Sequence, residues 1–557
     1  MGERGGGPLP PRPWPRSGWS PAAQAVAVIA ALVAFHALNN WVILGSSEHV
    51  LDFHAASYFF KIKTLLDRLA SGSWLSGLRL WATTRQSHPP LYMVSAAPLV
   101  AWHGGFSAAI MVNMAYLAVL LAAVYGAASR WYGHGTGLLA AFLVSMFPTV
   151  FALSRVFTFD FALTALVALT VWLIAAARFD SLRWCAALGV VVGAGLLAKQ
   201  TYAVYLAAAA LWVLLDPENR RAPRRLAHAA FSLAVGLALA APWYAPKAGS
   251  VLSKAVYDYF ESARNEGEPF FYVKSLFFRQ LGPAHFIAAL AAMAWSLKER
   301  QRALAWGVIA FLAFWSLASN RVDRLILAVV PFIGIMTAAG VMACSRRAGS
   351  WLAAVFVGLS LAQFAAVSYG TGRQPELPGE ERGFEGVGRW SPRRFDPECG
   401  LYAKVRHSRD WRSLAARAAE LAGAGRPEGT VRVLSMTDGW TSLGSELWSR
   451  LLEAGVRAEV RSILPGTDLT EEALSRWLRT ADLVVVEHQP ARLPIIRTAR
   501  EAFEKERLAG SYGLAGSFSL QEDYGFSVYR NLHPIRPERG APDQGSADAF
   551  LARPSSQ

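Results

Sequence analysis

Apolar residues in this sequence are gathered into long runs that fill the first two thirds of the chain. The longer runs match the roughly 20 residues that an α-helix needs to cross a bilayer. The runs lie at about 22–44, 89–103, 107–128, 136–153, 156–177, 184–199, 201–215, 226–243, 283–297, 303–318, 325–343 and 351–369. This pattern predicts a mainly α-helical fold, a polytopic membrane bundle over residues 21–370.

Basic residues between the runs predict how the bundle is oriented. They cluster at Arg12 and Arg16, Arg178 and Arg183, Arg220 to Arg225, Lys298 to Arg302, and Arg346 and Arg347. Cytoplasmic loops carry an excess of Lys and Arg. We therefore expect a cytoplasmic N-terminus, while the loops at 45–88, 244–282 and 319–324 and everything after residue 370 lie outside the cytoplasm.

The number of runs is even, which contradicts this orientation unless one run does not cross. The run 89–103 is the best candidate, because it opens with His88-Pro89-Pro90 and ends beside Gly104-Gly105. Such a piece would lie at the outer interface or dip into the membrane as a re-entrant segment. Eleven crossings then remain, and Arg130 becomes cytoplasmic.

The first outer loop contains an amphipathic stretch at 54–70. Tyr58, Phe59, Ile62 and Leu65 recur at helical spacing, while the charged residues fall mostly on the other face. This is typical of a helix that lies in the membrane interface rather than one that spans it.

The chain changes character after residue 370. Residues 371–410 are rich in Gly, Pro and Arg and read as a linker, and residues 411–532 predict a small extracytoplasmic α/β domain. Its expected elements are strands at Val431–Ser435 and Leu483–Glu487, helices at Leu443–Ala454 and Glu471–Arg479, and a hairpin of Gly510–Leu520 with Gly525–Arg530. The termini, 1–20 and 533–557, are expected to be disordered.

Composition agrees with a membrane protein. Of the 557 residues 53% are hydrophobic and 17% charged, and the mean hydropathy is +0.27. The net charge of +15 lies largely in short loops between apolar runs, so it indicates topology and not a nucleic-acid partner. The three cysteines form no disulfide framework or zinc-ligand spacing. The C-terminal domain shows no phosphate-binding loop and no catalytic triad signature.

Two acidic positions stand out at the outer face. Glu48 and Asp52 follow the first run, where a carboxylate could act as general base on an acceptor hydroxyl or amine. Alternatively, Asp52 merely caps the interfacial helix that begins near Phe53. The second position is Asp160, at the outer end of its helix, where the helix dipole alone could also explain a carboxylate.

Basic residues at the same face suit an anion. Arg321 and Arg324 precede a run, and Lys199 lies between two closely spaced runs. Arginine binds phosphate oxygens bidentately, although these arginines could instead pair with Asp323 at the surface, and a lysine can reach the interface without a ligand. The loop 244–282 adds Arg279 and several aromatic residues that are also typical of an interface belt.

The order of these motifs resembles that of a known superfamily. The acidic first loop is followed by His-Pro-Pro-Leu-Tyr at 88–92, Arg155 to Asp160, Gly-Leu-Leu-Ala-Lys-Gln-Thr at 195–201, Ala-Pro-Trp-Tyr at 241–244, and a basic loop before Leu-Ala-Val-Val-Pro-Phe at 327–332. Over about 20–370 this resembles the GT-C fold glycosyltransferases of the protein mannosyltransferase and aminoarabinose transferase (ArnT-like) superfamily.

The resemblance implies a function and a set of residue roles. Such enzymes move a sugar from a polyprenyl-phosphate or polyprenyl-diphosphate carrier to a lipid, glycan or protein acceptor at the outer face, with inversion. In this chain the resemblance would place the enzyme in the bacterial inner membrane. The implied catalytic residues are Asp52, its rival Glu48, and Asp160. The implied substrate-binding residues are His54, His88, Lys199, Gln200, Arg279, Arg321 and Arg324.

Other readings remain open at this point. A divalent metal could lie between Asp52 and Asp160. A transporter or flippase for a lipid-linked substrate would also combine many spans with intramembrane charges, but the chain shows no internal repeat. A membrane-anchored assembly factor would act through its C-terminal domain.

Overall fold

A computed structural model describes most of the helical part and much of the C-terminal part. The described residues are 19–46, 53–70, 88–256, 270–298, 302–318, 321–344, 346–369, 431–436, 458–462, 471–487, 494–521 and 524–534, with single positions at 72, 259, 420 and 451. The expected linker 371–410 lies outside these ranges, as do the expected disordered tails except for residues 19–20 and 533–534.

The helical part follows the apolar runs closely. Its elements are α1 (Pro21–Ser46), α2 (Phe53–Ala70), α4 (Leu91–His103), α5 (Phe106–Tyr132), α6 (His134–Met146), α7 (Pro148–Leu153), α8 (Phe159–Ala177), α9 (Leu182–Ala198), α10 (Tyr202–Leu215), α11 (Pro217–Arg220), α12 (Pro223–Tyr244), η1 (Ala245–Lys247), α13 (Ala248–Val256), α14 (Phe271–Ser275), η3 (Leu276–Gln280), α15 (Pro283–Ser296), α16 (Arg302–Leu317), η4 (Asp323–Val329), α17 (Val330–Ala343) and α18 (Arg346–Tyr369).

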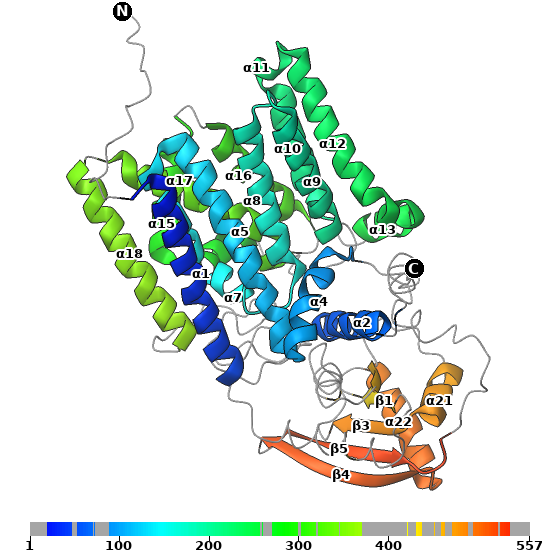
Figure 1. The fold of residues 1–557 in the computed structure, drawn as a ribbon. Helices are drawn as coiled ribbons and strands as arrows, with labels where there is room; N and C mark the ends of the chain where they lie inside the picture. Colours follow the sequence, from blue (N-terminus) through cyan, green and yellow to red (C-terminus); the bar gives the residue numbers. More distant parts are fainter. Residues whose placement is uncertain are drawn as a thin grey trace, which may run out of the picture.

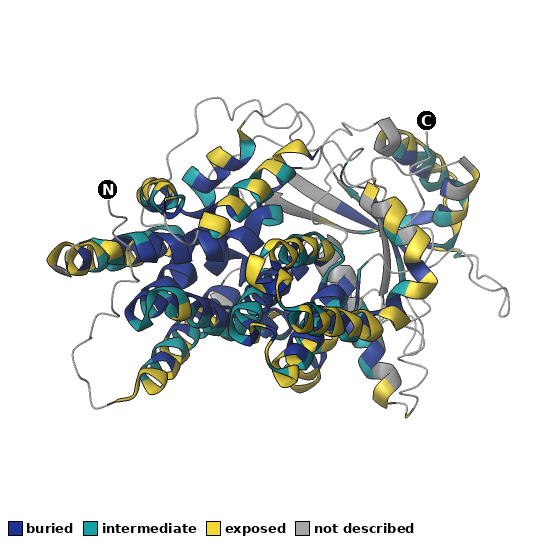
Figure 2. Ribbon diagram, turned by 90° about the horizontal axis from the view of Figure 1, so that it is seen from above, coloured by how far each residue is buried: buried dark blue, intermediate teal, exposed yellow. Residues whose placement is uncertain are grey.

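Three helices form the centre of the bundle. In the most apolar stretches of η4–α17, α8 and α5, 83%, 67% and 56% of the residues are buried, against 28%, 22% and 11% in α1, α12 and α18. Figure 1 shows α1 and α18 on one flank and α9, α10 and α12 on the other, and Figure 2 shows the buried residues gathered in the interior. The flanking helices keep large apolar side chains exposed, among them Trp41, Leu237 and Trp351. Lipid is the solvent that suits such surfaces.

Six described helices are long and apolar enough to cross a membrane, and five shorter ones are also apolar. Together these equal the eleven expected crossings, and α4 belongs to neither group. The multi-pass membrane fold is thereby confirmed. That the five shorter helices cross, and which end faces the cytoplasm, stay predictions.

The stretch 54–70 forms a helix, as its periodicity predicts. In Figure 1, α2 lies across one end of the bundle, next to α4. Its apolar face buries Tyr58, Phe59 and Ile62 in a cluster with side chains of α4 and α5. Each Å² of apolar surface that this packing removes from water contributes about 25 cal/mol to its stability.

Two apolar runs are divided differently from the expectation. The run 136–153 is broken into α6 and α7, because Phe147 precedes Pro148 and adopts an extended conformation (φ −66°, ψ 132°). The run 156–177 becomes helical only at Phe159, since Thr158 is extended and caps α8 with its side chain. The residues before Thr158 therefore form a connection between α7 and α8.

The C-terminal part contains a mixed sheet. Its strands are β1 (Val431–Met436), β2 (Ala458–Ser462), β3 (Leu483–Glu487), β4 (Tyr512–Gln521) and β5 (Tyr524–Asn531), in the order β2-β1-β3-β5-β4. The three strands β2, β1 and β3 are parallel, and β5 is antiparallel to both β3 and β4. The α/β character of this domain is confirmed.

Most elements expected in this domain are present. The strands β1 and β3, the helix α21 (Glu471–Thr480) and the final hairpin match the sequence pattern, whereas β2 and α22 (Pro494–Leu508) were not predicted. Most of the expected helix Leu443–Ala454 lies outside the described residues. In Figure 1 the sheet lies at the same end of the bundle as α2, the end opposite α11.

The orientation can be tested with single cysteines. Glu218 on α11 and Glu472 on α21 are both exposed, with 72% and 85% of their side chains accessible. In a chain whose Cys185, Cys344 and Cys399 are replaced by Ser, we expect a membrane-impermeant maleimide to label Glu472→Cys on intact spheroplasts and Glu218→Cys only after lysis. The reverse labelling would contradict the cytoplasmic placement of the basic loops.

Candidate functional site

Asp160 lies at the start of α8, in the second position after the cap. The Thr158 hydroxyl accepts the Asp160 backbone N–H at 3.5 Å and donates to Asp160 Oδ2 at 3.0 Å. The Asp160 side chain is 4% exposed. A buried carboxylate needs opposite charge or several hydrogen-bond donors to be tolerated.

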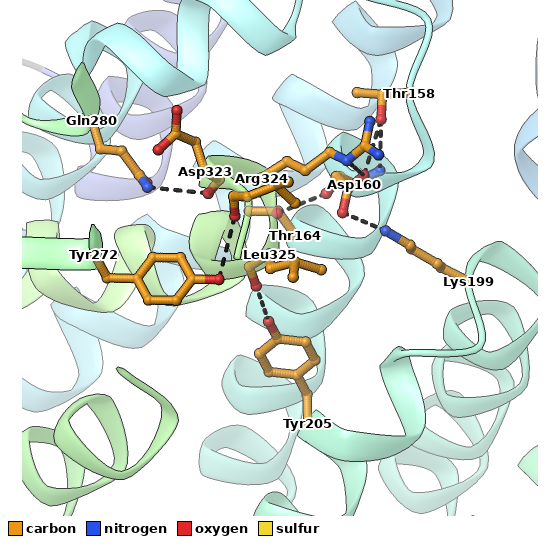
Figure 3. Close-up of polar contacts among 11 residues, drawn as sticks. Thr158, Asp160, Thr164, Lys199, Tyr205, Tyr272, Gln280, Asp323, Arg324 and Leu325 are labelled. Carbon is orange, nitrogen blue, oxygen red and sulfur yellow. Dashed lines mark hydrogen bonds and ion pairs between the residues drawn. The ribbon is translucent and has the colours of Figure 1, made fainter. Parts of the chain in front are cut away.

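Two cations flank the Asp160 carboxylate. Lys199 Nζ lies 2.6 Å from Oδ1, and Arg324 Nε lies 3.9 Å from Oδ2. Figure 3 shows the two side chains approaching Asp160 from opposite sides, one from the α9–α10 turn and one from η4. One buried carboxylate thus faces two cations, and the group as a whole carries positive charge.

The position of Lys199 follows from a tight reversal between α9 and α10. Lys199 ends α9 in an extended conformation, and its carbonyl accepts the N–H of Tyr202 at 3.0 Å. The Tyr202 ring lies directly against Gly195, where any Cβ would collide with it. The glycine of the Gly-Leu-Leu-Ala-Lys-Gln-Thr motif therefore lets α10 fold back and places Lys199 at the end of the hairpin.

Consecutive residues of η4 serve different partners. Asp323 turns toward Arg279, with Nη1 3.0 Å from Oδ2, and its carbonyl accepts Gln280 Nε2 at 3.1 Å. Arg324 turns toward Asp160 instead. A 3₁₀ helix has three residues per turn, so neighbouring side chains point about 120° apart.

Two buried tyrosines hold the backbone of this segment. The Tyr205 hydroxyl donates to the Leu325 carbonyl at 2.7 Å, and the Tyr272 hydroxyl donates to the Val322 carbonyl at 3.4 Å. Burial raises the pKa of Tyr272, and the nearby charge of Asp323 raises it further, so the phenol stays protonated and keeps donating. These contacts fix the direction in which Arg324 leaves η4 (Figure 3).

An aromatic cluster adjoins the carboxylate. The His88 ring stacks on Phe159 with centroids 5.1 Å apart, and the Tyr58 ring of α2 meets the edges of both. His88 is therefore next to the residue that precedes Asp160. The Pro-Pro pair after His88 leads directly into α4.

The structure brings together part of the predicted site. Lys199, Arg324, His88 and Asp160 gather at the start of α8, and Arg279 lies on the other side of η4. Arg321 donates to the Ala318 carbonyl at 3.1 Å, and Gln200 follows Lys199 with its Oε1 buried. Glu48 and Asp52 lie outside the described residues, and of His54 only the backbone in α2 is described.

Some polar residues of this region carried no signal in the sequence. Thr158, Tyr205 and Gln280 look like ordinary helix-end residues. Thr158 bonds to Asp160 two residues further on, whereas the contacts of Tyr205 and Gln280 join segments far apart in the chain. Tyr272 belongs to the loop 244–282, whose aromatic residues are also typical of an interface belt, but the side chain of Tyr272 is buried in the protein. A buried hydroxyl needs a partner, and Val322 supplies it.

The described residues do not favour a metal at Asp160. Among them, no three His, Cys, Asp or Glu side chains are grouped as metal ligands. Both Asp160 oxygens already face a cation or a hydroxyl donor, so a metal ion there would meet like charge.

The fold and the site together define a class of protein. It is a polytopic membrane protein with fixed cations and a buried carboxylate at one end of its helical bundle, beside the amphipathic helix α2. Fixed Lys and Arg side chains are typical of sites that bind a phosphate.

Comparison with known proteins finds one family that part of the chain resembles. Residues 87–245 match the family model described as dolichyl-phosphate-mannose-protein mannosyltransferase. Over this segment the chain is similar to that family, and its fold is that of ArnT, a GT-C glycosyltransferase. The resemblance expected from the sequence is confirmed. No curated protein matches the chain by sequence.

Solved structures show the same fold at low identity. ArnT from Cupriavidus metallidurans bound to undecaprenyl phosphate is 14% identical with a TM-score of 0.59, and the alignment covers 92% of this chain and 100% of that one. The apo form of that protein is 15% identical with a TM-score of 0.58, and the alignment covers 93% of this chain and 100% of that one. An Archaeoglobus fulgidus oligosaccharyltransferase tethered with an acceptor peptide is 10% identical with a TM-score of 0.50. That alignment covers 89% of this chain and 74% of the other.

Proposed function

We propose that this protein transfers a sugar from a polyprenyl-phosphate carrier to a lipid, glycan or protein acceptor at the extracytoplasmic face of a bacterial inner membrane. The observation that carries the proposal is the pairing of Lys199 and Arg324 around one buried carboxylate. The superfamily match and the solved ArnT structure with undecaprenyl phosphate support the choice of carrier.

The charge balance suits departure of a phosphate. As the bond between the sugar and the carrier phosphate breaks, the phosphate gains one negative charge. Cations that are already fixed in place stabilise that charge without reorganisation. A carboxylate flanked by two cations is a poor base. In this scheme Asp160 therefore does not remove the acceptor's proton, and its role is to hold Lys199 and Arg324 in position.

The base would be a different carboxylate. Asp52, or its rival Glu48, would remove the proton from the acceptor hydroxyl or amine as it attacks the anomeric carbon from the side opposite the phosphate. That geometry inverts the anomeric configuration. The aromatic cluster of His88 and Phe159 would form a wall near the sugar.

Carrier binding provides a test that does not require the sugar to be known. We expect Lys199→Met and Arg324→Gln each to weaken binding of undecaprenyl phosphate to the purified protein in nanodiscs by about tenfold or more, because each loses a charged hydrogen bond worth roughly 1.5–3 kcal/mol. Titration with the carrier lipid measures the change.

Matched controls lie at the other end of the bundle. Arg183 is exposed at the start of α9, and Arg347 is exposed at the start of α18. The substitutions Arg183→Met and Arg347→Gln each remove one positive charge, as the two site variants do. These variants should bind like the wild type. Equal losses in all four variants would show that the carrier responds to overall charge and not to this site.

A flippase for a lipid-linked substrate remains the second candidate, since such a protein would also bind the carrier phosphate. Proteoliposomes separate the two. A transferase forms free polyprenyl phosphate only when donor and acceptor are both present, whereas a flippase moves labelled carrier between leaflets without consuming it.

A further inference from the structure

The connection between α7 and α8 has a backbone whose carbonyls are held by one buried amide. Asn113 of α5 is fully buried. Its Nδ2 lies 2.8 Å from the Val156 carbonyl, 3.2 Å from that of Ser154 and 3.4 Å from that of Leu153. Carbonyls that leave a helix end in an apolar interior need such donors.

Tyr92 of α4 completes this arrangement. Its hydroxyl donates to Asn113 Oδ1 at 2.8 Å, which sets the amide with Nδ2 toward the connection. Its ring packs on Phe157 and on Phe159, with centroids 4.7 and 5.1 Å away. Tyr92 thus contacts the residues on both sides of Thr158.

The other side of the connection is also fixed. Asn40 of α1 donates to Ser154 Oγ at 2.9 Å and accepts from Arg155 Nε at 2.9 Å. Arg155 also donates to Ser368 of α18 at 3.0 Å. Four helices therefore hold the few residues that lead into Asp160.

We infer that Tyr92 and Asn113 are positioning residues for Asp160, and through it for Lys199 and Arg324. Neither residue contacts those cations in the described structure. They fix the path of the chain from Leu153 to Thr158, and this path sets where Asp160 begins α8. A shift there would change the distances of 2.6 and 3.9 Å that join Asp160 to its two cations.

This inference explains the second half of the His-Pro-Pro-Leu-Tyr motif. His88 contributes the ring that lies on Phe159, and Tyr92 contributes the hydroxyl that orients Asn113. Burying a phenol and an amide costs free energy unless they are paired, so an apolar pair would serve packing alone equally well.

The test compares two hydroxyl deletions on neighbouring rings. Tyr92→Phe removes the bond to Asn113 and keeps the ring, and we expect kcat for sugar transfer to fall about tenfold, the equivalent of one hydrogen bond, with an unchanged KM for the lipid-linked donor. Tyr116→Phe is the control, because its hydroxyl bonds to Ser95 of α4 and its ring lies 5.8 Å from Tyr92. It should retain the kcat of the wild type.

A second variant gives a readout that packing alone would not change. Asn113→Asp keeps the shape and the acceptor for Tyr92 but directs an oxygen at the carbonyls of the connection. When the carboxyl is protonated its O–H restores a donor, so the ratio of its kcat to that of the wild type should rise as the pH is lowered. A ratio that does not vary with pH would overturn the inference.

The inference rests on the proposed transfer, and the outcomes separate the two. If the wild-type protein transfers no sugar from the lipid extract of its own membrane, the proposed function fails. If the wild type is active and Tyr92→Phe matches Tyr116→Phe, the positioning role fails alone. A fall in kcat for Tyr92→Phe that disappears when the rate is divided by the amount of folded protein would also contradict it, since that result indicates a loss of folded protein.

Discussion

Asp160→Asn is expected to lower sugar transfer at least a hundredfold, because it removes the negative charge that lies between Lys199 and Arg324. The two cations would then face each other in a buried site. Removing one partner of a buried ion pair typically costs about 3–5 kcal/mol of stability. We therefore expect a lower midpoint of thermal unfolding in detergent as well as a lower rate.

Asp180→Asn serves as the control for this substitution. Asp180 pairs with Arg225 at 2.9 Å, but 57% of its side chain is exposed, and exposed pairs contribute about 0–1 kcal/mol. Adding Lys199→Met to Asp160→Asn should restore part of the thermal stability without restoring transfer. An active Asp160→Asn enzyme with the midpoint of the wild type would contradict the role given to this carboxylate.

Asp52→Asn is expected to abolish transfer while leaving carrier binding intact. This prediction comes from the sequence, since Asp52 lies outside the described residues. An amide cannot accept the acceptor's proton, and loss of a general base typically costs about 10²–10⁴-fold in rate. The measurement is the polyprenyl phosphate formed from a lipid extract of the native membrane, detected by mass spectrometry.

Glu48→Gln is the matched comparison for Asp52. If Glu48→Gln is inactive and Asp52→Asn is active, the base is Glu48. If both are active, the first outer loop does not supply the base, and the proposed mechanism is wrong. Glu218→Gln, exposed at the other end of the bundle, should be active in either case.

Hydropathy along the sequence predicted most of the apolar helices and missed one break. A run of apolar residues reports how long a helix is and whether lipid suits it. The even number of runs conflicted with the predicted orientation and singled out 89–103 as the run that does not cross. That run forms α4, the one expected run outside both groups of apolar helices that the structure describes. The break at Phe147 was missed, although Pro148 was a signal that could have found it.

The sequence predicted which charged residues belong to the candidate site better than it predicted which of them form ion pairs with each other. Lys199, Arg324 and Asp160 were singled out by charge at an outer loop or helix end. The sequence also allowed Arg321 or Arg324 to pair with Asp323 nearby, whereas the structure pairs Asp323 with Arg279 and brings Arg324 to Asp160. Which neighbour each side chain faces depends on how η4 is rotated about its axis. The sequence of one short helix does not determine that rotation, because it depends on the helices that pack against η4.

The sequence by itself determined the membrane class, the helical character of 54–70, the small C-terminal domain and the charged residues around which chemistry is expected. These follow from composition and from periodicity within one segment. Only the tertiary structure decided that Lys199 and Arg324 share Asp160, and that Tyr92 reaches the α7–α8 connection through Asn113. Those contacts join helices distant in the chain, and they depend on how the helices pack against each other.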